Sequence, residues 1–201
     1  DLIFLGVKPQ MMESLLAPLK FSLNERPGRF ILCSMAAGLS IARIQEMAGE
    51  DYPVIRIMPN TPAMVGRGVA GLYAPADVAA ADRETAEALL AATGKTVWVA
   101  EESGIDAITA ISGSGPAYVF YLIEALEEAA VHLGFDAATA KMLALETFAG
   151  ALALAESSPE SVATLRARVA SPGGTTERAI ASFDAAQLKA VNVAAAFLAK
   201  Q

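Results

Sequence analysis

Short, almost continuously apolar runs alternate with helix-like stretches through the first hundred residues of the chain. The strand candidates are Leu2–Val7, Phe30–Met35, Val54–Met58, Val69–Tyr73 and Thr96–Val99. Helix candidates lie between them at residues 11–19, 40–49 and 79–92. Apolar runs without polar alternation are typical of parallel strands that helices cover on both faces. Residues 1–100 are therefore predicted to form an α/β layer around a parallel sheet.

Beyond about Glu101 the strand pattern ends and the chain becomes Ala-rich, which predicts an all-α domain over residues 101–201. We expect Ser114 to cap a first long helix with Pro116 in its first turn, and Gly134 to end it. A second helix, at about 137–156, is apolar around most of its circumference. Such a helix must be buried, so we expect a subunit interface and a homo-oligomer, with a tightly packed monomeric bundle as the alternative.

Composition excludes several classes of function. The 201 residues carry a formal net charge of -7, whereas nucleic-acid binding requires clustered Lys and Arg. The chain has one cysteine, Cys33, and one histidine, His132, which by themselves cannot form an intramolecular disulfide, a zinc cage or a classical Ser-His catalytic pair, so we expect no metal and a core thiol.

No membrane partner is expected from the sequence. The longest uncharged run, Ala107–Ile123, is shorter than a bilayer span and is interrupted by Gly113–Pro116. Because no secretory signal is visible either, the cytoplasm is the expected location.

A literal G-x-G-x-x-G pattern occurs at Gly66, Gly68 and Gly71. A dinucleotide fingerprint requires a preceding strand and a following helix, so that the helix N-terminus meets the pyrophosphate. Here the glycines lead into the apolar run Leu72-Tyr73-Ala74, and we interpret them as a loop and a strand edge.

Two polar segments directly follow predicted strands. Lys8, in Val7-Lys8-Pro9, could meet phosphate or ribose oxygens at the carboxyl edge of the sheet, or be a solvated loop residue. In Met58-Pro59-Asn60-Thr61-Pro62 two prolines stiffen the backbone around Asn60 and Thr61, which could contact a ligand or satisfy their own backbone.

Two glycine-containing segments belong to the helical part. Ser112-Gly113-Ser114-Gly115-Pro116 precedes a long helix, where free N–H groups could receive an anion or simply be capped. Ser171-Pro172-Gly173-Gly174-Thr175-Thr176 lies between two helix candidates. Consecutive glycines can turn N–H groups toward a ligand, and a helix beginning near Thr175 adds its positive end. This loop is either a carboxylate cradle or a capped interhelical turn.

Five motifs together resemble the pyrroline-5-carboxylate reductase family in order and spacing. They are Val7-Lys8-Pro9, Ser34-Met35-Ala36-Ala37-Gly38, Met58-Pro59-Asn60-Thr61-Pro62, Gly113-Ser114-Gly115-Pro116-Ala117-Tyr118 and the loop Ser171–Thr176. The resemblance covers essentially the whole chain. One departure is at the front, because family members begin with a strand and a Gly-rich turn about sixty residues before the equivalent of Asp1.

The resemblance implies the C-terminal portion of a Rossmann dinucleotide-binding domain over residues 1–100, followed by a helical substrate-binding domain that forms a homodimer, in some members extended to a decamer of dimers. It implies reduction of Δ1-pyrroline-5-carboxylate to L-proline, the last step of proline biosynthesis, with NADPH or less often NADH. Implied cofactor-side residues are Val7, Lys8, Pro9, Ala36, Asn60 and Thr61.

For the substrate side we expect Ser171 and the N–H groups of Gly173, Gly174 and Thr175 to bind the carboxylate, with Gly115 and Pro116 nearby. Thr176, the proposed catalytic residue, would hydrogen-bond the ring nitrogen. Two alternatives stay open. One is a related Rossmann dehydrogenase or imine reductase, and the other is a non-catalytic binding module of the same fold.

Overall fold

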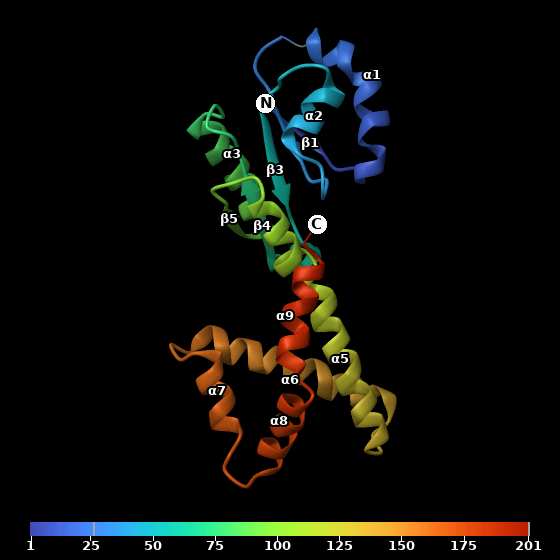
Figure 1. The fold of residues 1–201 in the computed structure, drawn as a ribbon, viewed down its shortest axis with the longest axis vertical. Helices are drawn as coiled ribbons and strands as arrows, with labels where there is room; N and C mark the ends of the chain where they lie inside the picture. The colour runs from blue at the N-terminus through green and yellow to red at the C-terminus, as the bar shows by residue number, and fades with distance from the viewer. Residues whose placement is uncertain (26, 201) are drawn as a thin grey trace. The chain divides into compact units, whose positions relative to one another are not determined.

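The computed structural model describes residues 1–25 and 27–200 and divides them into two compact units. The first comprises Asp1–Pro116 together with the C-terminal residues from Ala196, and it contains the β-sheet (Figure 1). The second, Ala117–Ala195, is built from helices. Each unit is described separately below.

The sheet of the first unit has five strands in the order β1-β2-β3-β4-β5. The strands are β1 (Leu2–Leu5), β2 (Ile31–Ser34), β3 (Val54–Met58), β4 (Gly68–Tyr73) and β5 (Gly94–Trp98). Each lies where the apolar runs predict one. The prediction of an α/β layer followed by a helical part is confirmed.

The direction of β4 corrects the expectation of a parallel sheet. β1, β2 and β3 are parallel, and β4 is parallel to β5, but β3 and β4 pair antiparallel, with Met58 opposite Gly71. The reason is the length of the connection. Residues 59–67 hold only the 3₁₀-helix η2 (Thr61–Val65), whereas a crossover between parallel strands needs about a dozen residues or more.

Helices cover both faces of the sheet, as the continuous apolar runs require. On one face, α1 (Met12–Asn24) and α2 (Ile41–Ala48) bury a cluster that includes Leu16, Ile44 and Leu32. On the other, α3 (Ala80–Ala91) packs over Ile55 and Leu72. Helix α1 is longer than the predicted 11–19 and continues past Pro18.

The thiol of Cys33 lies in the sheet core, fully buried in β2. Burial raises its pKa to about 11, because a thiolate would lose its hydration there. The thiol therefore stays protonated at neutral pH. The prediction of a core cysteine is confirmed.

Five helices follow the short helix α4 (Gly104–Ile108) and the π-helix η3 (Thr109–Gly113). They are α5 (Gly115–His132), α6 (Ala137–Ser157), α7 (Val162–Val169), α8 (Thr175–Ala185) and α9 (Leu188–Leu198), and the first two match the predicted helices closely. A short 3₁₀-helix, η1 (Pro9–Met11), precedes α1.

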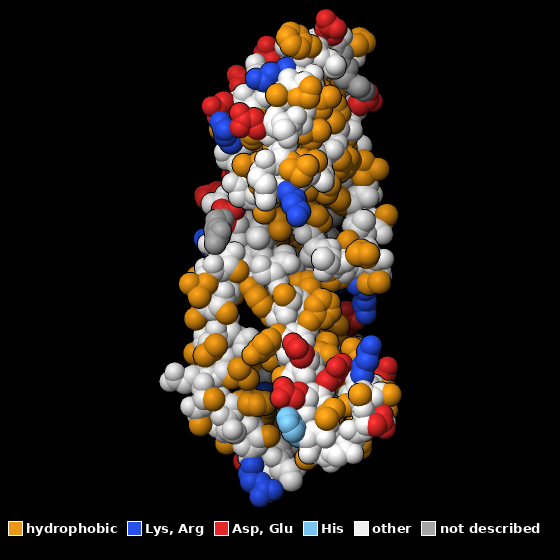
Figure 2. Space-filling view, turned by 90° about the vertical axis from the view of Figure 1, so that its right-hand side faces the viewer, with side chains coloured by type: hydrophobic (Ala, Val, Ile, Leu, Met, Phe, Trp, Pro, Cys, Tyr) orange, Lys and Arg blue, Asp and Glu red, His pale blue; other side chains and the backbone are white. Residues whose placement is uncertain are grey.

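The helical unit leaves most of its apolar surface uncovered. Within Ala117–Ala195 the buried hydrophobic side chains among the described residues are only Ala130, Ala140 and Ala144. Large side chains such as Leu152 and Leu154 on α6 are more than half exposed. Figure 2 shows hydrophobic side chains over much of the displayed surface of the helices. A single copy of this unit therefore lacks a core of its own.

Of the helices in the described part of the chain, α6 has the length and apolarity to cross a bilayer, and little of it is buried. Length and composition alone also fit a helix covered by another subunit. The sequence predicts that this helix is buried, but within one copy of the chain most of its surface is exposed.

Gly94 should be irreplaceable in the sheet. Its φ is +143°, and an added Cβ would lie 2.0 Å from the carbonyl oxygen of Gly68. We expect Gly94→Ala to lower the free energy of unfolding by at least about 2 kcal/mol, because backbone strain and a clash combine. Urea unfolding would measure the loss.

Gly28→Ala is the matched control for this substitution. The φ of Gly28 is +90°, but nothing lies within 4 Å of an added Cβ, so this variant measures the cost of the left-handed backbone conformation without a steric clash. Equal losses in the two variants would show that the contact between Gly94 and Gly68 does not constrain the sheet.

Candidate functional site

Three loops meet at the carboxyl edge of the parallel strands β1, β2 and β3. Val7-Lys8-Pro9 follows β1, the segment containing Ala36 follows β2, and Asn60 and Thr61 follow β3. In open α/β sheets this edge is where ligands bind. The first unit thus brings together all six residues of the predicted cofactor side.

These residues present different groups to a ligand. The side chains of Lys8 and Thr61 are exposed, and Lys8 precedes η1 without capping it. Ala36 is 5% exposed and packs into the core beneath α2, so only its backbone is available at this edge. Its N–H donates to the Ser34 hydroxyl at 3.3 Å, which shapes the loop.

The side-chain amide of Asn60 connects two other segments. Its Nδ2 donates to the carbonyl oxygen of Ser112 at 2.9 Å, and its Oδ1 accepts the N–H of Val69 at 2.9 Å. The partners determine the amide orientation, because one is a pure acceptor and the other a pure donor. Asn60 therefore fixes the start of β4 and the π-helix η3 at the end of β3.

The segment 109–116 differs from the expected free helix N-terminus. α4, η3 and α5 follow one another directly, and the N–H of Ser114 donates to the carbonyl oxygen of Thr109 at 2.8 Å. Ser114 has helical dihedrals, so it does not cap α5 as predicted. The reason is the wider π turn, which carries the helical path through the glycines. Gly115 and Pro116 begin α5, half-buried.

The loop Ser171–Gly174 is a tight turn at the start of α8. The N–H of Gly174 donates to the carbonyl oxygen of Ser171 at 2.9 Å, and Gly173 has a φ of +73°. Pro172 followed by a left-handed glycine is typical of a type II turn. Gly174 then occupies the N-cap of α8.

Backbone donors gather at this end of α8. The first turn of a helix leaves its N–H groups without intrahelical acceptors, here those of Thr175, Thr176 and Glu177. The N–H of Gly173 already donates to a carboxylate, Oε2 of Glu177, at 2.7 Å. The structure therefore shows the capped interhelical turn, and the role of the loop as a carboxylate cradle stays a prediction.

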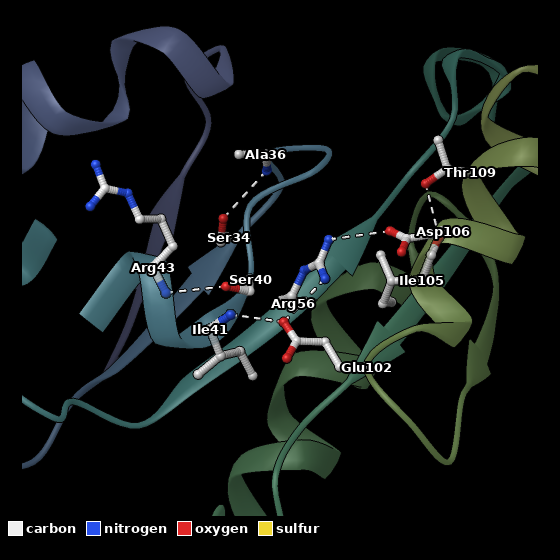
Figure 3. A network of polar contacts seen from close by, with 10 residues as sticks. All are labelled: Ser34, Ala36, Ser40, Ile41, Arg43, Arg56, Glu102, Ile105, Asp106 and Thr109. Carbon is white, nitrogen blue, oxygen red and sulfur yellow. Dashed lines mark hydrogen bonds and ion pairs between the residues drawn. The ribbon is translucent and has the colours of Figure 1, made fainter. Parts of the chain in front are cut away.

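A polar network that the sequence analysis did not single out lies around Arg56 of β3 (Figure 3). Arg56 in β3 is 5% exposed and makes ion pairs with Glu102 at 3.1 Å and Asp106 at 3.9 Å. The signal was present in the sequence, because Arg56 interrupts an otherwise apolar strand, Val54–Met58. A buried charge in such a strand needs partners.

The three glycines of the rejected fingerprint have structural explanations. Gly66 ends η2 in the left-handed conformation, and the other two glycines lie within β4 (Gly68–Tyr73), so no helix begins directly after them. Gly71 allows close packing, since an added Cβ would lie 2.7 Å from Ile108. Their interpretation as a loop and a strand edge is confirmed.

A mostly parallel sheet that helices cover on both faces, followed by a set of apolar helices, defines a protein of the Rossmann class with a helical C-terminal part. A family model described as pyrroline-5-carboxylate reductase dimerisation matches residues 102–201. The chain belongs to the pyrroline-5-carboxylate reductase family, as the motifs indicate.

Curated relatives support this membership. The chain is 47% identical to pyrroline-5-carboxylate reductase from Pseudomonas aeruginosa, over 92% of this chain and 67% of that protein. It is 41% identical to the Haemophilus influenzae reductase, over 92% of this chain and 68% of the relative. The chain thus spans about two thirds of the length of these proteins.

Solved structures agree. The reductase from Coxiella burnetii is similar with a TM-score of 0.87 and 38% identity, over 99% of this chain and 73% of that one. The Plasmodium falciparum enzyme, crystallised with NADP bound, has a TM-score of 0.89 and 32% identity, over 99% and 74%. The likeness covers both units.

Asn60→Asp should destabilise the contacts of Asn60 with β4 and η3. The variant keeps an acceptor for Val69 but places a carboxylate oxygen against the Ser112 carbonyl, so a part-buried hydrogen bond becomes a repulsion. We expect a loss of about 1–3 kcal/mol in the free energy of unfolding. Chemical denaturation would measure it, with Thr61→Ala, an exposed neighbour, as the control. A fully stable N60D protein would contradict this role.

Proposed function

We propose that this chain carries the substrate loop and part of the cofactor edge of a reductase that converts Δ1-pyrroline-5-carboxylate to L-proline with NAD(P)H. Membership of the family and the NADP-bound relative support the reaction and the cofactor. The observation that carries the substrate assignment is the carboxylate of Glu177 on the Gly173 N–H, because a carboxylate oxygen fits this donor.

The residues at the carboxyl edge fit one side of a nicotinamide nucleotide. Lys8 offers an exposed ammonium for phosphate or ribose oxygens, and the Thr61 hydroxyl is exposed at the same edge. Ala36 can offer only its backbone, because its side chain is buried. Asn60 acts by holding the loops in place, because both ends of its side-chain amide already bind groups within the chain. NADPH, when bound, supplies the hydride.

On the substrate side, the N–H groups of Thr175, Thr176 and Glu177 and the positive end of α8 hold the carboxylate, and the Ser171 hydroxyl assists. Gly173 joins this set when the Glu177 side chain moves away, because both carboxylates accept from the same N–H. Gly174 shapes the turn, its N–H donating to Ser171. Gly115 and Pro116 begin α5 in the first unit, and their assignment to the substrate side rests on the family resemblance alone.

The reaction adds one hydride and one proton across the ring C=N bond. The protein needs no covalent nucleophile; its task is to hold the ring against the hydride donor in a fixed orientation. Thr176 hydrogen-bonds the ring nitrogen and so fixes which ring atom faces the donor. Solvent protonates the imine before it binds.

The relatives favour this reductase over the two alternatives. A related dehydrogenase or imine reductase acting on another substrate would prefer that compound in a substrate panel. A non-catalytic module would bind proline without binding NADPH, which calorimetry with each ligand would reveal.

Self-association follows from the dimerisation family match and from the uncovered helical surface. We propose that α6 packs against a second copy of the chain and not against lipid. Dimers are then the basic unit, with a decamer of dimers as the larger form. We also propose that the protein is cytoplasmic. The apolar side chains of α6 match the surface that a homodimer buries.

Thr176→Ala should reduce kcat/KM for pyrroline-5-carboxylate by roughly ten- to several-hundred-fold, which corresponds to about 1.5–3 kcal/mol for one transition-state hydrogen bond. NADPH oxidation by the full-length protein, followed by absorbance, would measure it. Thr176→Ser keeps the hydroxyl and should retain most activity. Unchanged kinetics in the Ala variant would remove Thr176 from the mechanism.

The double variant Leu145→Glu/Leu152→Glu should dissociate the dimer. The two residues lie seven positions apart on one face of α6, 41% and 56% exposed, and buried carboxylates would be strongly disfavoured in an interface. Light scattering would report a monomeric mass. Lys189→Glu, at an exposed polar position of α9, is the control and should stay dimeric. A dimeric double variant would place the interface elsewhere.

A further inference from the structure

Arg56 lies on the face of the sheet where two helical segments meet (Figure 3). It shares this face with Val54, which packs in the cluster beneath α1 and α2. On the neighbouring strand β4, Tyr73 lies opposite Arg56, and Gly71, which lies opposite Met58, packs under Ile108 of α4. The guanidinium thus occupies the junction between α2 and the segment that leads into α4.

Glu102 links Arg56 to the beginning of α2. Its Oε1 accepts both Nη1 of Arg56, at 3.1 Å, and the backbone N–H of Ile41, at 2.8 Å. Ile41 is the first residue of α2, and its N–H has no acceptor within the helix. A carboxylate 61 positions away in the chain therefore completes the cap of α2, beside Ser40, whose hydroxyl accepts from Arg43.

The second nitrogen of the guanidinium is not fully satisfied. Nη2 of Arg56 is buried without a hydrogen-bond partner among the described residues, and it makes only a long ion pair with Oδ1 of Asp106, at 3.9 Å. A buried ion pair of this kind adds little net stability over an apolar pair of equal volume. Its contribution is geometric, because it fixes the Glu102 carboxylate in one orientation.

The loop 35–40 is held by this arrangement. At its start the Ser34 hydroxyl accepts the Ala36 N–H, and at its end Glu102 accepts the Ile41 N–H. The loop lies at the carboxyl edge of β2, next to the loops that follow β1 and β3. Its position is therefore set from the helical segment 102–113, which Asn60 holds through Ser112.

We propose that Arg56 and Glu102 are positioning residues for the dinucleotide, which set loop 35–40 against the edge of the sheet without touching the ligand. This inference rests on the proposed function, because it takes the carboxyl edge as the cofactor side. It predicts that loss of the Glu102 carboxylate weakens NADPH binding, while the substrate loop at 171–176 is unaffected.

The test uses the full-length protein and three variants. Glu102→Ala removes the acceptor and the charge, and Glu102→Gln keeps an oxygen for the Ile41 N–H but loses the charge. Glu101→Gln is the matched control, because it makes the same charge change at an exposed neighbouring position. The Gln variant also covers the case in which the Ala variant does not fold.

Three readouts separate positioning from general damage. We expect Glu102→Ala to raise the NADPH Kd, measured by calorimetry, and the KM for NADPH by roughly tenfold, as for one lost hydrogen bond to a charged group. The KM for pyrroline-5-carboxylate and kcat should change less than about twofold. Hydrogen exchange at the Ile41 amide should accelerate, whereas Glu101→Gln should match the wild type in all three.

An unchanged NADPH Kd in both Glu102 variants, or an equal rise in the two KM values, would overturn the positioning role. Failure of the proposed function looks different, because the wild type itself would then not oxidise NADPH with this substrate. The Kd and hydrogen-exchange measurements still decide the role of Glu102 in that case, since neither depends on turnover.

Discussion

The amide of Asn60 makes the contacts on which the arrangement at the carboxyl edge of the sheet depends. It follows β3 where the chain reverses direction, and it binds the backbone N–H of Val69 at the start of β4 and the carbonyl oxygen of Ser112 in the π-helix η3. Each partner is a backbone group that would otherwise be left unpaired in a part-buried position. One side chain thus determines where the sheet reverses and where the helical segment 109–116 lies against it.

The positions of the strands and the long helices could be predicted from apolar periodicity, because burial of whole faces leaves a repeated pattern in the sequence. Strand direction could not, since an apolar run such as Val69–Tyr73 reads the same in either direction. The short connection after Met58 was the available signal. The π turn before Ser114 also escaped prediction, because glycine and serine suit a cap as well as a widened helical turn.

The sequence predicts which segments make up the candidate site, but few of the contacts between their residues. The loop at Ser171–Thr176 and the three strand-end segments were identified by composition and by family resemblance. Three features became visible only in the three-dimensional structure: the hydrogen bond between Gly173 and Glu177, the burial of Ala36 and the ion pairs of Arg56. Each depends on distances between groups that the order of residues does not give. An isolated Arg in an apolar strand is nevertheless a signal that sequence analysis can use.

The nearly coreless helical unit has a consequence for how the protein behaves at different abundance. Its large apolar side chains are uncovered in one copy, and the matching family model describes dimerisation. Under the proposed packing against a second copy, folding is coupled to association, and mass action governs the amount of folded protein. The midpoint of thermal unfolding should therefore rise with total protein concentration. In a cell, a modest fall in expression would reduce the folded fraction as well as the number of molecules.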